Sequence, residues 1–476
     1  MVSSITESLK KKIVIIGAGP GGYEAALHAR GLGAEVTLVE RQGTGGAAVL
    51  TDVVPSKTLI ASADTIHRFH EVQDLGVHLV GGPQDGTEIE GLAANLQTIN
   101  ARLLRLAATQ SRDIRRGLEK EGVQVVDGTG SIADPNTVHV KAEDGMEYDL
   151  TADAILVAVG AHPRTLPSAQ PDGERILTWT QVYNMEEIPE HLVVVGSGVT
   201  GAEFASAYNG LGAKVTLVSS RDQVLPGEDS DAADVLENVF ERRGLTVVSR
   251  SRAEAVERTD DGVVVTLSGG RKIAASHCLL AVGSIPNTEG LGLEEVGVKL
   301  EDSGHIAVDR VSRTSVPSIY AAGDCTGVLP LASVAAMQGR IAMAHVLGDA
   351  VKPLRTAVVA SNIFTSPEIA SVGISEQAIK DGSFSADVIK LDLATNARAK
   401  MMKVEDGFVK LFARKGPGTI VGGVVVGPRA SELIFAISVA VSKGLTVDDF
   451  SETFTVYPSL SGSISEAARR LHHLQS

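Results

Sequence analysis

Residues 13–40 read IVIIGAGPGGYEAALHARGLGAEVTLVE. The run begins with apolar residues only, as expected for a strand that is buried on both faces of a parallel sheet. Gly17, Gly19 and Gly22 follow in a G-x-G-x-x-G pattern. The residues after the glycines predict a helix, and the last residues predict a second strand that ends at Glu40. This order of strand, turn, helix and strand predicts a parallel α/β unit.

Each glycine of this pattern has a physical role in dinucleotide binding. Gly17 permits the tight turn, Gly19 lets a pyrophosphate approach the backbone, and Gly22 lets helix and strand pack closely. The free N–H groups at the start of the helix attract phosphate. Glu40 can accept hydrogen bonds from ribose hydroxyls. The alternative, a glycine-rich turn without a ligand, is disfavoured because strand, helix and terminal acid are all present.

A second unit of the same kind occupies residues 192–220, which read LVVVGSGVTGAEFASAYNGLGAKVTLVSS. Gly196, Gly198 and Gly201 repeat the glycine spacing of the first unit. Because a dehydrogenase with a single dinucleotide needs only one such unit, the repeat predicts two bound dinucleotides.

The two units differ at the position of the terminal acid. The first glycine of the first unit precedes Glu40 by 23 positions, and the same offset from Gly196 reaches Ser219, with Ser220 and Arg221 next. A missing carboxylate with a nearby arginine can accommodate a ribose 2′-phosphate. We therefore expect the second site to accept NADPH. We expect it to accept NADH too, because a single arginine favours the 2′-phosphate only modestly. The alternative is that Arg221 is a solvated surface residue, and a preference for NADH of about tenfold or more would favour it.

Length and charge set broad limits on the function. A chain of 476 residues is long enough for about three domains. Its formal net charge of −15, without a basic run, makes nucleic acid and anionic membranes poor partners. The apolar runs are shorter than the roughly 20 residues that span a bilayer. No apolar stretch of a signal peptide follows the first charged residues. We expect a cytoplasmic protein without a membrane span.

The chain has only two cysteines, Cys278 and Cys325. They are far apart, and no group of His, Cys and carboxylate residues has the spacing of a metal site. We expect two unpaired thiols and no metal.

Residues 43–59 read GTGGAAVLTDVVPSKTL. This stretch resembles the redox-disulfide segment of the pyridine-nucleotide disulfide oxidoreductases, such as lipoamide dehydrogenase, which reads GGTCxxxxCxPSK. The two cysteine positions hold Ala48 and Val53, whereas the lysine of the motif is retained as Lys57. The resemblance implies that the segment lies beneath a flavin ring and that the redox disulfide is absent.

The resemblance extends over about residues 11–470 and includes ILVAVGAHPR (155–164), LLAVGSIPNTEGL (279–291), TSVPSIYAAGDCTG (314–327) and GFVKLFARKGPGTIVGGVVVGPRASELI (407–434). Within the family, the chain is most similar to actinobacterial NAD(P)H quinone reductases that lack the cysteine pair and the catalytic histidine. The implied fold is α/β, with two Rossmann-like dinucleotide-binding domains and a C-terminal α+β dimerisation domain. The implied segments are an FAD-binding domain (1–160 and 285–354), an NAD(P)-binding domain (161–284) and an interface domain that forms a homodimer (355–476).

The same resemblance assigns roles to individual residues. Lys57 pairs with Glu203 beside the flavin and the nicotinamide, Asp324 accepts hydrogen bonds from the ribityl chain, and a helix from Ala332 directs its N-terminus at the flavin. Further FAD contacts are assigned to Gly46, Gly130, Val159 and Gly160, and an NAD(P) contact is assigned to Gly283. Gly130 is predicted to lie with Gly128 between strands at 123–126 and 137–141.

A second departure from the family pattern concerns the proton carrier. The family motif HPTxxE supplies a histidine and a glutamate, and the matching positions hold Tyr457 and Gly462. Tyrosine has a reference pKa of about 10 and does not shuttle protons at neutral pH as histidine does. Tyr457 can still donate a hydrogen bond to a bound carbonyl. The alternative is that it only packs at a dimer interface.

These two departures exclude the usual reaction of the family as the main activity. Thiol–disulfide exchange needs a thiolate and a group that manages the proton, and neither stands at the expected place. We therefore expect an FAD-dependent NAD(P)H:quinone oxidoreductase, in which a hydride passes to flavin N5 and a flat apolar quinone then takes the electrons in a ping-pong cycle. The alternatives are a soluble pyridine-nucleotide transhydrogenase and a flavin-bound scaffold without enzymatic turnover.

Overall fold

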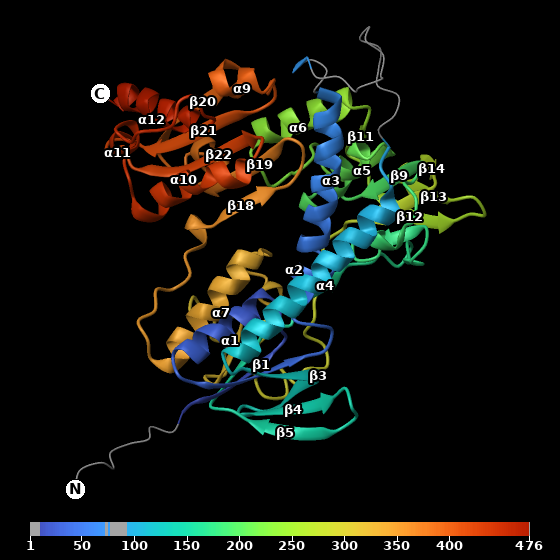
Figure 1. Ribbon diagram of the computed structural model, residues 1–476, viewed down its shortest axis with the longest axis vertical. Helices are drawn as coiled ribbons and strands as arrows, with labels where there is room; N and C mark the ends of the chain where they lie inside the picture. The colour runs from blue at the N-terminus through green and yellow to red at the C-terminus, as the bar shows by residue number, and fades with distance from the viewer. Residues whose placement is uncertain (1–9, 72–74, 77–92, 476) are drawn as a thin grey trace. The chain divides into compact units, whose positions relative to one another are not determined.

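The computed structural model describes residues 10–71, 75–76 and 93–475 (Figure 1). These residues form two compact units. The first unit contains the chain up to Ser56, Ala101–Arg164 and Gly283–Arg355, and the second contains Lys57–Asn100, Thr165–Val282 and Thr356–Ser476. Among the described residues, no helix has the length and apolar composition needed to cross a membrane.

A seven-stranded sheet forms the centre of the first unit, in the order β17-β6-β1-β2-β3-β4-β5. The strands from β17 to β3 are parallel, and β3, β4 and β5 pair antiparallel at one edge. The bounds are β1 Lys12–Ile16, β2 Glu35–Glu40, β3 Gln124–Asp134, β4 Thr137–Ala142, β5 Glu147–Thr151, β6 Ala154–Val157 and β17 Ile319–Ala321. A two-stranded ribbon joins β7 (Ala161–Pro163) and β16 (Ser284–Pro286).

Helices α1 (Pro20–Gly31) and α7 (Ala332–Leu347) lie side by side against this sheet (Figure 1). Close approach is possible because glycine stands at the crossing: a Cβ on Gly339 would lie 2.1 Å from the carbonyl oxygen of Gly21. Pro20 suits the first turn of α1, where its missing N–H costs nothing. Helix α2 (Gly46–Leu50) also lies in the first unit. Helix α3 (Val53–Glu71) begins in this unit, and α4 (Leu96–Lys120) ends in it.

The second unit contains a five-stranded parallel sheet in the order β11-β10-β9-β15-β8. Its strands are β8 Ile176–Thr178, β9 His191–Val195, β10 Lys214–Val218, β11 Thr246–Val248 and β15 His277–Leu280, with helices α5 (Val199–Gly210) and α6 (Ser230–Arg242). An antiparallel three-stranded sheet is formed by β12 (Ala253–Arg258), β13 (Val263–Leu267) and β14 (Lys272–Ala275). The strand–turn–helix–strand order of the first unit is thus repeated.

The C-terminal part of the second unit is an antiparallel sheet in the order β18-β19-β22-β21-β20. Its elements are β18 Ala360–Ile363, β19 Glu368–Gly373, α8 Glu376–Lys380, β20 Ala386–Asp392, α9 Ala397–Met401, β21 Phe408–Arg414, β22 Ile420–Gly427, α10 Ala430–Lys443, α11 Val447–Ser451 and α12 Gly462–Gln475. Ile434 and Ile437 of α10 share one buried core with Leu471 of α12 and Leu411 of β21. The predicted sheet backed by helices is therefore present.

The prediction that Gly128 and Gly130 lie between two strands is wrong. Both residues lie inside β3, where Gly128 pairs with Ala142 and Gly130 with Val140. A Cβ on Gly128 would lie 2.5 Å from the carbonyl oxygen of Lys141. Glycine is needed here for the close approach of two strands and does not mark a loop.

The predicted FAD-binding segment 1–160 and the compact units divide the chain differently. Lys57–Asn100 belongs to the second unit, together with the second glycine-rich motif. Compactness does not identify the ligand of a segment, so the three predicted nucleotide-binding segments and the predicted interface segment stay predictions.

Candidate functional site

The first glycine-rich turn lies between β1 and α1 and leaves room for a ligand at one position only. A Cβ on Gly17 would lie 2.4 Å from the carbonyl oxygen of Ala158, and one on Gly22 would lie 1.9 Å from that of Gly17. At Gly19 a Cβ would meet no described atom within 4 Å, and its φ is an ordinary −67°. The protein itself therefore needs glycine at two positions, and the third is open, as a close pyrophosphate requires.

Glu40 ends β2 beside this turn, and its carboxylate is held by backbone groups. One carboxylate oxygen accepts from the N–H of Ala18 at 2.6 Å. The other accepts from the N–H of Gln42 at 2.7 Å and from that of Gly43 at 3.2 Å. The side chain is buried, and its orientation is fixed without any ligand. This arrangement fits the ribose contact predicted for Glu40.

Segment 43–50 packs against the same turn. A Cβ on Gly46 would lie 2.8 Å from the Cα of Gly19, and Gly46 has a φ of 58°. The predicted FAD residues Gly19 and Gly46 are thus brought together. Ala48 in α2 and Val53 at the start of α3 are both half-buried.

The end of β6 lies beside the glycine-rich turn, and Gly130 of β3 lies beside the last residue of β1. The side chain of Asn287 donates to the carbonyl oxygen of Val159 at 2.9 Å, and Asn287 N–H donates to that of Gly160 at 3.0 Å. Gly130 faces the side chain of Ile16, which a Cβ would approach to 3.3 Å. Parallel α/β folds bind ligands at this carboxyl edge of the strands. The FAD contacts assigned to Val159, Gly160 and Gly130 stay predictions.

Asp324 lies in a short turn after β17, and burial raises its pKa above the usual value. The turn is held by Gln338 of α7, whose amide oxygen accepts from Gly323 N–H at 2.9 Å and whose amide nitrogen donates to Thr326 Oγ1 at 3.2 Å. Ala332, the first residue of α7, is exposed. Gln338 was not predicted, although polar residues in an otherwise apolar helix are a usable signal.

The second glycine-rich turn repeats the geometry of the first. A Cβ on Gly196 would lie 2.2 Å from the carbonyl oxygen of Ala281, and one on Gly201 would lie 1.8 Å from that of Gly196. Gly198 is again open, with nothing within 4 Å and a φ of −72°. Gly283 begins a stretch of the first unit and has a φ of 97°. Its predicted NAD(P) contact stays a prediction.

Ser219 occupies the place of the terminal acid but faces inward. Its hydroxyl accepts from Ser197 Oγ at 2.7 Å and from Arg221 N–H at 3.1 Å, and it is fully buried. Ser197 corresponds to Ala18 of the first unit, whose N–H binds the carboxylate of Glu40. A pair of small hydroxyls therefore replaces that carboxylate. Ser220 and Arg221 are exposed at the same edge.

Lys57 and Glu203 meet, as the resemblance implies. Lys57 Nζ lies 2.6 Å from one carboxylate oxygen of Glu203, and the other accepts from Phe364 N–H at 2.9 Å. Lys57 Nζ also lies 5.1 Å from the centre of the Phe364 ring. Glu203 is buried, whereas the side chain of Lys57 is 26% exposed. The pair therefore presents a positive group to solvent or ligand over a buried counter-charge.

Phe364 was not predicted as part of this group. Its backbone N–H, supplied by the C-terminal sheet, satisfies the second oxygen of Glu203. A backbone donor leaves no signature in the side-chain sequence, so only the fold reveals it.

The two cysteines cannot replace the missing redox pair. Cys278 and Cys325 are free and fully buried. Burial raises the pKa of each thiol to about 12. Because the thiolate is the reactive form, neither thiol is prepared for exchange.

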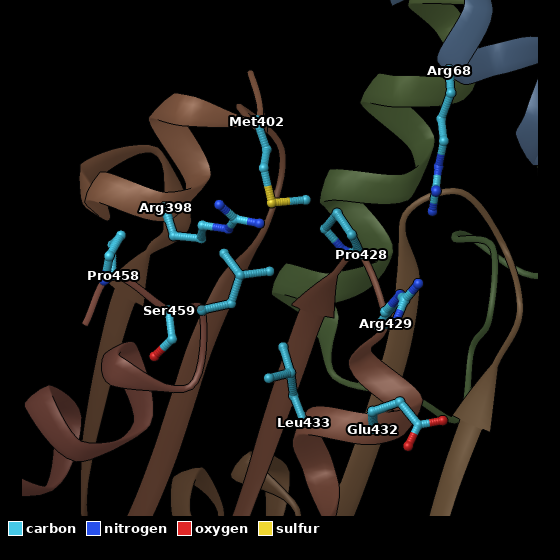
Figure 2. Close-up of a pocket in the computed structure, with 10 residues that line it drawn as sticks. Arg68, Arg398, Met402, Pro428, Arg429, Glu432, Leu433, Pro458 and Ser459 are labelled. Carbon is cyan, nitrogen blue, oxygen red and sulfur yellow. The ribbon is translucent and has the colours of Figure 1, made fainter. Parts of the chain in front are cut away.

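Tyr457 is 86% exposed on the C-terminal domain, and none of the contacts recorded for the described residues joins it to Lys57 or Glu203. Gly462 begins α12, where its N–H donates to Ser459 Oγ. Residues after Tyr457 help to form a pocket of about 680 Å³ (Figure 2). The pocket lining consists of Arg68, Arg398, Met402, Pro428, Arg429, Glu432, Leu433, Pro458, Ser459 and Leu460. None of them was predicted as a site residue.

Two family models match this chain. Residues 11–339 match the pyridine nucleotide-disulphide oxidoreductase family, and residues 359–468 match the dimerisation domain of that family. The matches agree with the paired glycine-rich units and with the C-terminal antiparallel sheet.

Several relatives are similar over nearly the whole chain. A Mycobacterium tuberculosis protein named NAD(P)H dehydrogenase (quinone) is 53% identical, over 97% of this chain and 94% of the relative. A dihydrolipoyl dehydrogenase of Geobacillus stearothermophilus is 34% identical, over 97% of this chain and 96% of the relative. The crystal structure of LpdA from M. tuberculosis is similar with a TM-score of 0.91 and 52% identity, over 97% of this chain and 99% of that chain. The present chain is therefore an FAD-dependent, NAD(P)H-using oxidoreductase of the pyridine nucleotide-disulphide oxidoreductase family.

Proposed function

We propose that this protein is an NAD(P)H:quinone oxidoreductase that works by a ping-pong cycle and does not reduce disulfides. The observation that carries the proposal is the combination of Ala48 and Val53 at the cysteine positions with an intact Lys57–Glu203 pair. The features that serve nucleotide binding are present, whereas the thiols that would receive electrons are absent. The name of the 53% identical M. tuberculosis relative supports a quinone as acceptor.

The residues of this chain bind and orient the reactants. When bound, FAD accepts a hydride from NAD(P)H and passes the electrons to a second substrate. The open position at Gly19 and the fixed carboxylate of Glu40 hold the first nucleotide, and Gly198 leaves the corresponding space for the second. Lys57 supplies a positive charge whose position is fixed by Glu203.

The acceptor is inferred from what segment 43–59 offers. Ala48 and Val53 are small apolar residues and provide neither a nucleophile nor a proton. Both buried cysteines are unreactive at neutral pH, because their pKa values are near 12. An acceptor that takes electrons directly, without covalent attachment to the protein, fits such a surface. Quinones have this property.

Reduction and reoxidation can be tested separately. The purified protein is reduced with NADPH without oxygen, and its flavin absorbance is followed after mixing with menadione, a benzoquinone, an oxidised nicotinamide analogue, lipoamide or glutathione disulfide. We expect quinones to reoxidise the flavin at least about 100-fold faster than either disulfide, because a missing covalent catalyst typically costs orders of magnitude.

Each alternative has its own result in this experiment. Fast reoxidation by the nicotinamide analogue alone would identify a transhydrogenase. A flavin that NADPH does not bleach would identify a scaffold without turnover. Rapid reoxidation by a disulfide would refute the central part of the proposal.

We also propose a homodimer formed by the C-terminal domain. Large apolar side chains are exposed on it: Phe435 is 71% exposed, Val456 76% and Phe454 fully exposed. Such side chains on a matched dimerisation domain support an interface with a second copy. There Tyr457 would either donate a hydrogen bond to the acceptor or pack against the partner. A cytoplasmic location stays a prediction from the sequence.

The cofactor preference gives a second test, at Arg221. We propose that this exposed arginine contacts the 2′-phosphate of NADPH. The inward-facing Ser219 occupies the place of the terminal acid, so no carboxylate repels the phosphate there. A charge-assisted hydrogen bond contributes about 1.5–3 kcal/mol. Arg221→Ala is therefore expected to raise the KM for NADPH about tenfold or more and to change the KM for NADH less than threefold.

Arg271→Ala is the matched control, since Arg271 is an exposed arginine in the turn before β14. It should leave both Michaelis constants unchanged. Equal effects of Arg221→Ala on NADPH and NADH would contradict a phosphate contact.

A further inference from the structure

Lys410 is a buried ammonium group surrounded by carboxylates in the second unit. Its side chain is 1% exposed and extends from β21 of the C-terminal sheet. Nζ lies 2.8 Å from each carboxylate oxygen of Asp229, 3.0 Å from Asp231 and 2.7 Å from Glu376. The three N–H donors of the lysine are thus all engaged.

The charges of this cluster balance. Lys380 lies 3.2 Å from Glu376, and Lys390 lies 3.1 Å from Asp231. With Lys410 these make three ammonium groups for three carboxylates. Burial alone lowers the pKa of Lys410, but its hydrogen bonds to the acids outweigh this and raise it above the usual value. Lys410 therefore remains charged at neutral pH.

The cluster joins the C-terminal sheet to the end of a candidate nucleotide-binding segment. Asp229 caps α6 by accepting from the N–H groups of Asp231 and Ala232. The chain between β10 and α6 is residues 219–229, which carry Ser219, Ser220 and Arg221. Because the cluster holds Asp229, it fixes the C-terminal end of segment 219–229.

The middle of the segment is tied to the second glycine-rich turn. Leu225 N–H donates to the carbonyl oxygen of Ser197 at 2.9 Å, and Leu225 is buried with a φ of 54°. Val224 N–H donates to Glu237 of α6 at 2.7 Å. The path from Asp229 to the turn that surrounds Gly198 is therefore short and hydrogen-bonded.

We propose that Lys410 is a positioning residue for the nicotinamide nucleotide: it holds segment 219–229 against the C-terminal sheet so that the ribose edge and the glycine-rich turn keep one geometry. This inference rests on the proposed use of that turn by NAD(P)H. It predicts a role in binding both NADP⁺ and NAD⁺, since the position of the whole segment depends on Asp229.

The test measures nucleotide binding directly. Lys410→Met holoenzyme is titrated with NADP⁺ and with NAD⁺ by calorimetry, and both dissociation constants are expected to rise about tenfold. In steady state the KM for NADPH should rise similarly, while kcat at saturating NADPH changes less than twofold. Lys443→Met is the matched control, because Lys443 is an exposed lysine in the last turn of α10 and lies outside the cluster. It should bind both nucleotides as the wild type does.

A second variant keeps the test informative if Lys410→Met alone does not fold. Lys410→Met with Asp229→Asn removes one charge of each sign and keeps an acceptor to cap α6. It should show the same weakened binding. Dissociation constants within twofold of the wild type in a folded variant would overturn the role of Lys410. If the wild type itself bound neither nucleotide, the proposed function would fail instead. Arg221→Ala, by contrast, should weaken NADP⁺ alone.

Discussion

Gly19→Ala is expected to give a folded protein that retains less than about a tenth of its FAD. A methyl group at this position meets no atom of the described protein within 4 Å, and the backbone φ of −67° suits alanine. The protein is therefore expected to lose no more than about 1 kcal/mol of stability, the typical difference between residues that cap a helix. The methyl group does occupy the space through which a pyrophosphate approaches the backbone. The measurement is flavin absorbance relative to protein absorbance after purification, with thermal unfolding followed by circular dichroism.

Gly31→Ala is the matched control for this variant. Gly31 lies at the other end of α1, and a Cβ there also meets nothing within 4 Å. It should keep all of its FAD and gain a few tenths to about 1 kcal/mol from the better helix former. A Gly19→Ala protein with full FAD occupancy and unchanged affinity would mean that this turn does not hold the pyrophosphate.

The glycine-rich units show how far the sequence alone reaches. Glycines have identifiable functions at fixed spacing, so the two Rossmann-like units and the meeting of Lys57 with Glu203 could be predicted from residue order and resemblance. Where a glycine serves strand packing, as at Gly128, the residue was wrongly placed between two strands. The local sequence does not say which neighbour a glycine must approach.

Contacts between distant segments that belong to no sequence motif were not predictable. Phe364 contributes a backbone N–H, Gln338 holds a turn from a neighbouring helix, and Lys410 neutralises acids about 180 positions away. Each depends on tertiary packing, and none belongs to a motif. The inward orientation of Ser219 also needed the structure, because its partner Ser197 lies on another strand end.

The largest effect on the reductive step is expected for Lys57→Met. Lys57 is the charged side chain whose position Glu203 fixes, at 2.6 Å, and it remains partly exposed. Removing one preorganised charge from a reaction site typically lowers the rate about 10²–10³-fold. The rate of flavin bleaching by NADPH, measured anaerobically by stopped flow, should fall by that factor. The variant should also be less stable by about 3–5 kcal/mol, because the buried carboxylate of Glu203 loses its counter-charge.

A double-mutant cycle distinguishes a catalytic pair from two independent residues. Glu203→Gln keeps an acceptor for Phe364 N–H but removes the charge that orients Lys57. If the two side chains act as a unit, the double variant Lys57→Met/Glu203→Gln should bleach no more slowly than Lys57→Met alone, and it should recover part of the lost stability. Lys214→Met, which removes an exposed lysine at the start of β10, controls for net charge. Bleaching by Lys57→Met within threefold of the wild type would show that the pair serves the fold and not the hydride transfer, whereas strictly additive losses would show that the two residues act independently.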